Sequence, residues 1–431
     1  MTRYFAVLLF LVSWCASVLA QDPSPIESLR DGFKRLERGR LTLITDLPID
    51  DELRAWPDVL DQAIAAWTQQ WRLDASKSQS WHLTAYLIGD RKRFIESELA
   101  PQVPNFEDGY QLQDTIFLVE QPSVYYRRHL FLHEATHWAM YRGFGGAGSP
   151  WFMEGMADLY GTHRWNERKL SLGILPRSPA EAPQWGRFKR LQEMLARDDI
   201  PSLRQIVSYT NDSGNRMDRY VWSWAACVFF SNHPRYRDAF FAAAEPPLDY
   251  SMNVSQKLLR SLEDRWPWVV AEWNGFLTDF DFGYDAGRSL PLLENADWKY
   301  LDAKESTVCE VSSLRGWQST GIRLRAGESL QLSADGSCQV GVGANDKPWN
   351  SQAQGITIRY FRHQPIGRLM ASIVPIPKDE STTLWQPIAI GRDATLKSES
   401  EGLLLLKINE AAGDLAGNQG SLRVVLERAD P

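Results

Sequence analysis

Apolar and polar positions alternate in three short segments of the first third of the chain, at residues 40–45, 81–88 and 113–119. A period of two residues predicts a β-strand for each segment. Between the first two, Leu53, Leu60, Ile64 and Trp67 have helical spacing, which predicts a helix over residues 50–71. Strands that lead into helices favour an α+β arrangement with a small N-terminal sheet.

Helical spacing dominates from about residue 123 to about residue 273, apart from a glycine-rich loop at 143–150 and a polar stretch at 209–215. Beyond about residue 290 the pattern changes to short alternating segments at 322–324, 330–332, 356–360, 403–408 and 422–426. Short strands separated by Gly, Asn and Asp turns predict a β-sandwich. The expected fold is an α+β domain at residues 40–285, with a small sheet and a helical C-terminal half, followed by a β-sandwich at 295–431.

The N-terminus has the pattern of a secretory signal. Arg3 gives a positive start, residues 5–14 are apolar, and Val18-Leu19-Ala20 fits a small-residue cleavage site. The apolar run is shorter than the roughly 20 residues that span a bilayer, so a membrane anchor is the weaker reading. We expect a signal peptide at 1–20, a polar leader at 21–39, and a secreted or periplasmic chain with no membrane span after signal removal.

Composition and cysteine content narrow the class of protein further. Hydrophobic residues make up 44% and charged residues 23%, so ordinary globular cores can form. A net charge of -7 without a Lys/Arg cluster argues against a nucleic-acid partner. Signal removal would discard Cys15, after which Cys309 and Cys338 are a candidate disulfide of an oxidising compartment. Cys227 lies in an apolar run and is expected to be a buried, unpaired thiol.

The chemistry centres on the sequence HEATH at residues 133–137, inside an apolar segment expected to be helical at 124–141. Four helical residues advance about 400° and rise ~6 Å, so His133 and His137 point the same way from adjacent turns and can share one ion. Glu134 lies beside the metal, where it can take a proton from the activated water. A purely structural site would not need Glu134, so the motif indicates catalysis.

A catalytic zinc site takes three protein ligands and keeps one position for water. The third ligand is expected to be Glu154, seventeen positions after His137 in the segment WFMEGMAD, because the glycine-rich loop allows a second helix to pack back on the first. Asp158 follows Glu154 by four residues and shares its helical face. Metal-bound His usually donates its other N–H to a carboxylate, so Asp158 is expected to hold His133.

Three further histidine and acidic residues and one tyrosine are candidates for the same site. His129 is excluded as a ligand, because on a straight helix it lies ~12 Å from His137. His163 and Glu167 remain fallback ligands. Tyr220, at the start of a later helix, is a candidate donor to the oxyanion, with packing in an aromatic helix as an equal alternative.

From about residue 40 to 280 the chain resembles the peptidase MA-like zinc metallopeptidases, the gluzincins related at a distance to thermolysin and the zinc aminopeptidases. The resemblance rests on HEATH at 133–137, WFMEGMADLYG at 151–161 and YVWSWA at 220–225. In gluzincins the Glu of the second motif is the third zinc ligand and an Asp four places on supports the first His, which matches Glu154 and Asp158. The family implies hydrolysis of a peptide laid along the edge of the sheet, here residues 113–119.

Residues 312–427 resemble the PA-IL-like galactose-binding lectin domain. The matching pieces are WQSTGI at 317–322, GRLMA at 367–371, PIAIG at 387–391, INE at 408–410 and GNQGS at 417–421. In that lectin calcium bridges protein and sugar, and the resemblance implies Glu410, Asp414 and Asn418 as calcium ligands here. Gly417 stands where the lectin has a second Asn, which removes one oxygen ligand and should weaken calcium.

The sequence thus predicts a secreted zinc peptidase that acts on protein or peptide substrates, with Glu134 as general base. An endopeptidase is expected, since the Gly-x-Met-Glu-Asn segment that recognises amines in the zinc aminopeptidases is missing. The alternative is a catalytically silent zincin scaffold with a sandwich that binds carbohydrate or another surface. A metal-dependent hydrolase of a non-peptide amide is a third hypothesis.

Overall fold

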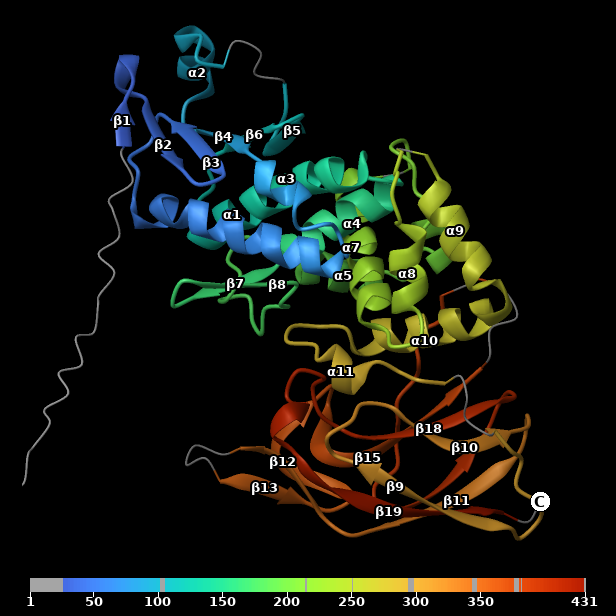
Figure 1. The fold of residues 1–431 in the computed structure, drawn as a ribbon. Coiled ribbons are helices and arrows are strands. Elements are labelled where there is room, and N and C mark those ends of the chain that lie inside the picture. The colour runs from blue at the N-terminus through green and yellow to red at the C-terminus, as the bar shows by residue number, and fades with distance from the viewer. Residues whose placement is uncertain are drawn as a thin grey trace, which may run out of the picture.

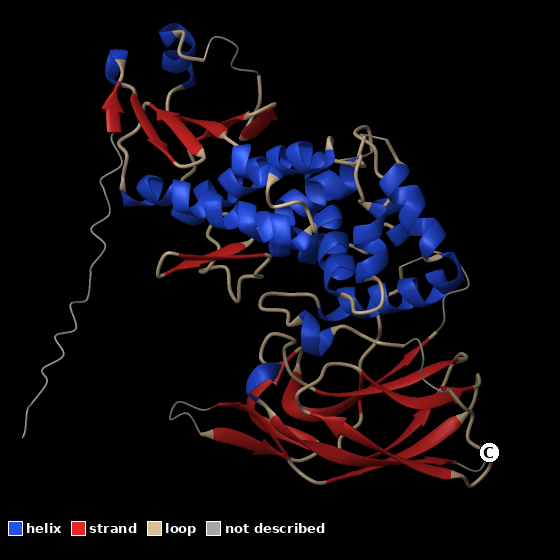
Figure 2. Cartoon of the chain, viewed as in Figure 1, coloured by secondary structure: helices blue, strands red, loops and turns tan. Residues whose placement is uncertain are grey.

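The computed structural model describes residues 26–100, 105–213, 215–249, 251–293, 298–342, 347–375, 380 and 382–429. The expected signal peptide and Cys15 lie outside these residues. The described part is a mixed α and β structure, with strands at both ends and helices between them (Figure 2). No helix within it has both the length and the hydropathy to cross a bilayer.

The N-terminal sheet has the strand order β1-β2-β3-β4-β6-β5 (Figure 1). Its strands are β1 Ile26–Ser28, β2 Lys34–Arg38, β3 Leu41–Thr45, β4 Leu83–Ile88, β5 Gly109–Leu112 and β6 Thr115–Val119. β3, β4 and β6 are parallel, and the remaining neighbours are antiparallel. The three strands expected from alternation are β3, β4 and β6, each within two residues of its expected bounds.

Two expectations for this sheet need correction. β1 and β2 lie in the expected leader but belong to the sheet, because β2 pairs with β3 along its whole length and β1 pairs with β2. Leu36 is the one fully buried residue of β2 and its neighbours are charged, so the strand has the composition of a polar leader. The free edge near the HEATH helix is β5 and not residues 113–119, because a tight turn after Leu112 folds β5 onto the outer side of β6.

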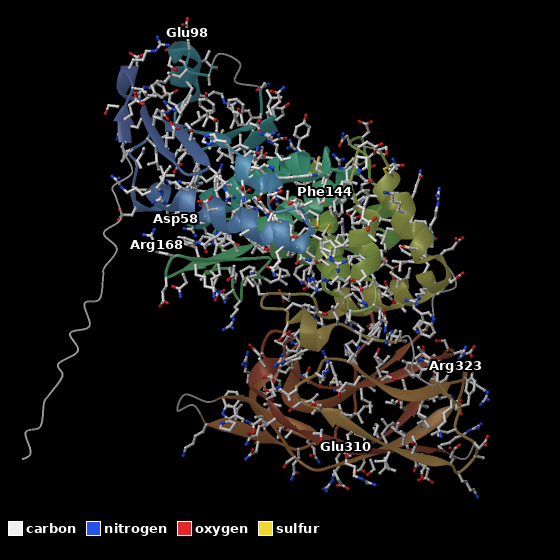
Figure 3. All side chains as sticks on the ribbon, in the orientation of Figure 1. Asp58, Glu98, Phe144, Arg168, Glu310 and Arg323 are labelled. Carbon is white, nitrogen blue, oxygen red and sulfur yellow. The ribbon has the colours of Figure 1, made fainter. Side chains whose placement is uncertain are left out.

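Helices fill the middle of the chain. They are α1 Asp51–Gln70, α2 Arg91–Ser97, α3 Val124–Phe144, α4 Pro150–Gly161, α5 Arg187–Ala196, α6 Leu203–Ile206, α7 Arg216–Asn232, α8 Arg237–Ala243, α9 Asn253–Ser261, α10 Trp266–Asp279 and α11 Ala286–Ser289. A hairpin that the helical pattern concealed, β7 His163–Asn166 and β8 Lys169–Leu172, interrupts them. Its turn is tied to α1 by an ion pair between Arg168 and Asp58, which lie side by side in Figure 3.

The C-terminal strands form two antiparallel sheets around a shared apolar core. One sheet has the order β10-β18-β15-β14, with β16 on β15, and the other has the order β13-β12-β19-β11-β17, with β9 on β19. The strands are β9 Ser306–Ser312, β10 Gln318–Leu324, β11 Ser329–Asp335, β12 Cys338–Val342, β13 Pro348–Ser351, β14 Gln354–Phe361, β15 Gln364–Val374, β16 Ile388–Ala389, β17 Asp393–Lys397, β18 Gly402–Ile408 and β19 Gln419–Arg428. All five segments expected to be strands lie within these elements.

The expected disulfide between Cys309 and Cys338 is wrong, because both thiols are free. Cys309 pairs with Val424 from one side of β19, and Cys338 pairs with Gly420 from the other side. The two cysteines are therefore two strand spacings apart across the sheet and four residues apart along it, which separates their Cα atoms by ~16 Å. A disulfide needs a Cα separation of about 4.4–6.8 Å. Cys227 is buried and unpaired, as expected.

The helical part and the sandwich share a buried contact. Ala271 of α10 packs with Trp317, Trp385 and Leu405 of the C-terminal part in one apolar cluster. Lys407 of β18 is buried and donates to Asp279 at the end of α10 over 2.7 Å. A buried charge needs such a partner, so the two parts meet as packed surfaces.

Candidate metal centre and active site

Two histidines face each other on α3. Ser123 caps the start of this helix by accepting a hydrogen bond from the Tyr126 amide, and Gly145 ends it at φ +78°. The one-turn spacing brings Nε2 of His133 to 3.2 Å from Nε2 of His137. Both rings are largely buried, with side-chain exposures of 10% and 12%.

Glu154 meets these histidines from α4. The short connection between Gly145 and Ser149 turns the chain so that α4 packs on α3. Oε2 of Glu154 lies 3.3 Å from Nε2 of His133 and 3.5 Å from Nε2 of His137. Gly155 allows α4 to approach α7 closely, since a Cβ there would lie 2.8 Å from the backbone carbonyl carbon of Ser223. Helix packing therefore fixes where Glu154 points.

The three atoms fit a zinc ion. Bonds of about 2.0–2.1 Å in a tetrahedron place ligand atoms about 3.3 Å apart, which is close to all three observed separations. His133, His137 and Glu154 also form one of two groups of described His and acidic side chains close enough to share an ion. Oε2 of Glu154 is buried and has no hydrogen-bond donor among the described residues. The donor set and the orphaned oxygen both suit a divalent cation.

Asp158 lies behind His133, on the side away from Glu154. Its Oδ1 is 3.3 Å from Nδ1 of His133 and 3.4 Å from Nε2 of His129. Arg187 donates to both carboxylate oxygens, over 2.9 and 3.0 Å. Burial raises the pKa of Asp158, but Arg187 and the two histidines outweigh it and hold that pKa well below its usual value. These partners favour the carboxylate form of Asp158, which faces Nδ1 of His133 and can orient that ring.

Arg187 is a site residue that the sequence reading missed. It lies on α5, where Phe188, Leu191 and Met194 are buried, and Arg187 is buried with them. An arginine on the apolar face of an amphipathic helix is a signal, because such a residue needs a buried partner. His129, the second histidine on Asp158, is buried and belongs to the same hydrogen-bonded group rather than to the Glu154 cluster.

Glu134 is the buried acid beside the histidines. Burial raises its pKa, and the positive charge of the neighbouring histidines only partly offsets this. Gly109, the first residue of the edge strand β5, packs directly on it. A Cβ at position 109 would lie 2.9 Å from the carboxyl carbon of Glu134, which is too close for two carbon atoms. The absence of a side chain at Gly109 thus makes the room that the carboxyl group occupies.

Tyr220 reaches the site from the first turns of α7. Its ring centroid is 6.5 Å from that of His133, and its hydroxyl accepts from Nε of Arg216 over 3.0 Å. Burial raises the pKa of Tyr220, and the charge of Glu154 raises it further, so the hydroxyl keeps its proton. Tyr220 and Glu154 both line a cavity of about 220 Å³.

The charges of the site favour a cation at its centre. Burial lowers the pKa of His133, yet the carboxylates of Asp158 and Glu154, each 3.3 Å from one of its ring nitrogens, raise it to about 10. Burial also raises the pKa of Glu154, but the two histidines outweigh it and hold that pKa below its usual value. Two carboxylates therefore surround the histidine pair with negative charge.

The fallback ligands lie elsewhere. His163 is in β7, where Nδ1 contacts the carbonyl of Gly161 at 2.8 Å and Nε2 contacts Arg128 at 3.3 Å. Glu167 is in the hairpin turn that follows, at φ +49°. Neither joins the groups of described residues that could share an ion.

The side chains expected to bind calcium are engaged with protein groups. The Asn418 amide donates to Glu410 over 2.6 Å and to the Ser313 carbonyl over 2.9 Å, while its oxygen accepts from the Gly341 amide. Asp414 forms an ion pair with Arg359. Burial raises the pKa of Glu410 to about 7. Calcium binding by this loop stays a prediction.

Comparisons with known proteins assign no family. No family model matches the chain, and no curated protein matches it. Among solved structures, the chain is similar to the EclA N-terminal domain, a PllA-like lectin, at 19% identity and a TM-score of 0.22, over 28% of this chain and 95% of that one. It is also similar to a conserved protein of unknown function from Bacillus anthracis, at 13% identity and a TM-score of 0.16, over 29% of this chain and 21% of that one.

A third structure is IMPa from Pseudomonas aeruginosa in complex with an O-glycopeptide. The identity is 11% and the TM-score 0.17, over 92% of this chain and 48% of that one. The chain thus spans less than half the length of the second and third structures. Neighbours at these identities and TM-scores assign no activity to the chain.

Proposed function

We propose that the chain is a zinc-dependent peptidase with His133, His137 and Glu154 as the ligands and Glu134 as the general base. The observation that carries the proposal is the convergence of three ligand atoms, 3.2 to 3.5 Å apart, beside the buried carboxyl group of Glu134. Zinc, when bound, would polarise the substrate carbonyl and make a water molecule easier to deprotonate.

The chain's own residues would divide the remaining work. Glu134 would take the proton from the attacking water and pass it to the leaving amine, and burial raises its pKa toward the range useful for both steps. Asp158 would hold the ring of His133. The Tyr220 hydroxyl would donate to the oxygen that becomes negative as water adds to the carbonyl.

The edge strand β5 would bind the peptide. β5 has β6 on one side and no described strand on the other. Asp108 accepts a ladder hydrogen bond from Val119 of β6, and ladder bonds alternate along an antiparallel pair. The N–H and C=O groups of Gly109 and Gln111 would then point outward, where an extended substrate can pair with them.

Zinc content and peptide cleavage test the proposal together. The purified chain should hold one zinc per molecule, and it should cleave a fluorogenic peptide library. Glu134→Gln should keep the zinc and lose activity by about 10²–10⁴-fold, the usual contribution of a general base. Full activity in Glu134→Gln would make the mechanism wrong.

Failure of this test would favour the other hypotheses. If the zinc-loaded protein cleaved no peptide but released amine from envelope amides, the non-peptide hydrolase would stand. If it cleaved nothing and the sandwich bound glycans, the silent scaffold would stand. Export, which we also propose, predicts that the mature chain begins near Gln21, as N-terminal mass spectrometry would show.

A further inference from the structure

Two arginines that form no ion pair with any described carboxylate line the cavity beside the candidate metal centre. Arg216 and Arg219 share this cavity of about 220 Å³ with Glu154 and Tyr220. Its walls come from α4, from the start of α7 and from the loop before α7, which contributes Tyr209. The cavity therefore adjoins the ligand Glu154 and the proposed oxyanion donor, where a residue of a bound substrate would lie.

Other arginines near this cavity form ion pairs with carboxylates, unlike Arg216 and Arg219. Arg187 and Arg190 of α5, which packs against α7, form ion pairs with Asp158 and Asp218. Arg216 and Arg219 form none with any carboxylate in the part of the chain that the structure describes. Glu154 and the exposed Glu107 act on the charge of Arg216 only from a distance.

Contacts with neutral groups hold both side chains in place. Arg216 donates through Nε to the hydroxyl of Tyr220, and its guanidinium carbon lies 5.3 Å from the centre of that ring. Arg219 donates through Nη1 to the carbonyl of Thr210, while its Nε is buried without an acceptor among the described residues. A buried donor that lacks an acceptor costs stability, so a ligand oxygen would be favoured there.

The charge balance of the cavity favours an anion. Glu154 is its acidic lining residue, and that carboxylate is directed to the two imidazoles. The cavity also lies at the N-terminus of a 17-residue helix, which adds a positive partial charge. A planar guanidinium pairs with a carboxylate through two parallel hydrogen bonds.

We propose that Arg216 and Arg219 bind a carboxylate carried by the substrate, beside the bond that is cut. This inference rests on the proposed peptidase function and names its substrate class, a peptide with an acidic side chain or a free C-terminus in this cavity. Both sources offer the same group. An acidic side chain lies within the peptide and a free C-terminus lies at its end, so suitable synthetic peptides can distinguish the two sources.

Binding to the inactive, zinc-loaded Glu134→Gln protein tests the cavity without catalysis. Fluorescence anisotropy would compare amidated peptides that differ by one Glu or Gln, and neutral peptides with a free or an amidated C-terminus. One of the two acidic peptides should bind about tenfold more tightly than its neutral match, which corresponds to one charge-assisted contact. The pair that shows the difference identifies the source of the carboxylate.

Variants connect the preference to these arginines. Arg219→Gln, made in the Glu134→Gln background, should abolish the preference for the acidic peptide, and Arg219→Lys should keep part of it because the charge remains. Lys189→Gln is the matched control, since it removes one exposed positive charge from α5 outside the cavity. Equal binding of acidic and neutral peptides, or a preference that survives Arg219→Gln, would overturn the inference.

Cleavage by the unmodified protein separates this inference from the proposed function. Cleavage without any preference for an acid would leave the peptidase standing and overturn the carboxylate site. An acid preference in binding that is lost in Arg219→Gln, without cleavage of any peptide, would support the carboxylate site and overturn the peptidase. A folding defect in Arg219→Gln would weaken the binding of the acidic and the neutral peptide equally. In that case Arg219→Lys decides the outcome, because the inference requires it to keep part of the preference for the acidic peptide.

Discussion

Gly109 and Glu134 show how a single missing side chain can fix a carboxyl group. The α-carbon of Gly109 borders the space that the Glu134 carboxyl fills, so any Cβ there must displace it. Glu134 is itself buried, with only 6% of its surface exposed. The exact place of the proposed base thus depends on a residue of the sheet, 25 positions earlier in the chain.

Gly109→Ala should lower kcat about 10²-fold while zinc content stays the same, because an ångström of misplacement costs roughly this much. Steady-state cleavage and metal analysis of the same sample measure both quantities. Gly417→Ala is the control, since a Cβ there meets nothing within 4 Å. Unchanged kcat in Gly109→Ala would show that the carboxyl group is not held by this contact.

Arg187 holds another carboxyl group, that of Asp158, behind the candidate metal centre. Arg187→Gln should lower the free energy of unfolding by about 3–5 kcal/mol, because it leaves the buried Asp158 without its cation. Arg190→Gln breaks the ion pair with Asp218, in which the Arg190 side chain is 34% exposed and the Asp218 side chain 22%. This variant should lower the free energy of unfolding by less than about 1 kcal/mol. Urea unfolding measures both variants, and equal losses would contradict this account of Asp158.

At the scale of elements, the sequence predicted what depends on local pattern. The period of two identified β3, β4 and β6, and the helical period identified α3 with its two histidines. The glycine-rich loop correctly placed a turn between α3 and α4. These features depend on neighbours in the sequence, and a single chain contains that information.

Features that depend on tertiary pairing were missed. β2 is mostly charged and β5 has only four residues, so neither has a strong pattern of its own. The pairing of Arg187 with Asp158 and the separation of Cys309 from Cys338 depend on which elements pack together. Sequence spacing alone does not determine such distances.

The edge strand gives the prediction at this scale. Gln111→Pro should raise KM for peptides about tenfold, because it removes one outward N–H that the substrate would accept from. Gln111→Ala keeps the N–H and should leave KM near that of the unmodified protein. Zinc content should be equal in both variants. An equal KM in the two variants would argue that the substrate does not pair with β5.

At the scale of the whole molecule, the sandwich shares a core with α10, and Lys407 joins the two parts through Asp279. The stability of the sandwich should depend on pH through Glu410. Burial raises the pKa of Glu410 from 4.5 to about 7. The folded state therefore binds the proton of Glu410 more tightly than the unfolded state does. The stabilisation that this gives is complete below about pH 4.5 and is lost as the pH rises through about 7.

Relative to Glu410→Gln, the unmodified protein should lose about 2 kcal/mol of stability between about pH 5 and about pH 8. Hydrogen exchange of peptides from β18 and β19 in urea, with a chelator present, measures the difference in the full chain. A difference that does not change with pH would show that Glu410 has an ordinary pKa in the folded state.

The central claim is that one metal ion unites α3 and α4, and crystallography at the zinc absorption edge tests it most directly. Anomalous maps from crystals of the zinc-loaded chain should show one peak, about 2.0–2.2 Å from Nε2 of His133, Nε2 of His137 and a carboxylate oxygen of Glu154. A zinc-saturated crystal without a peak at this position, or with Glu154 turned away from it, would contradict the account.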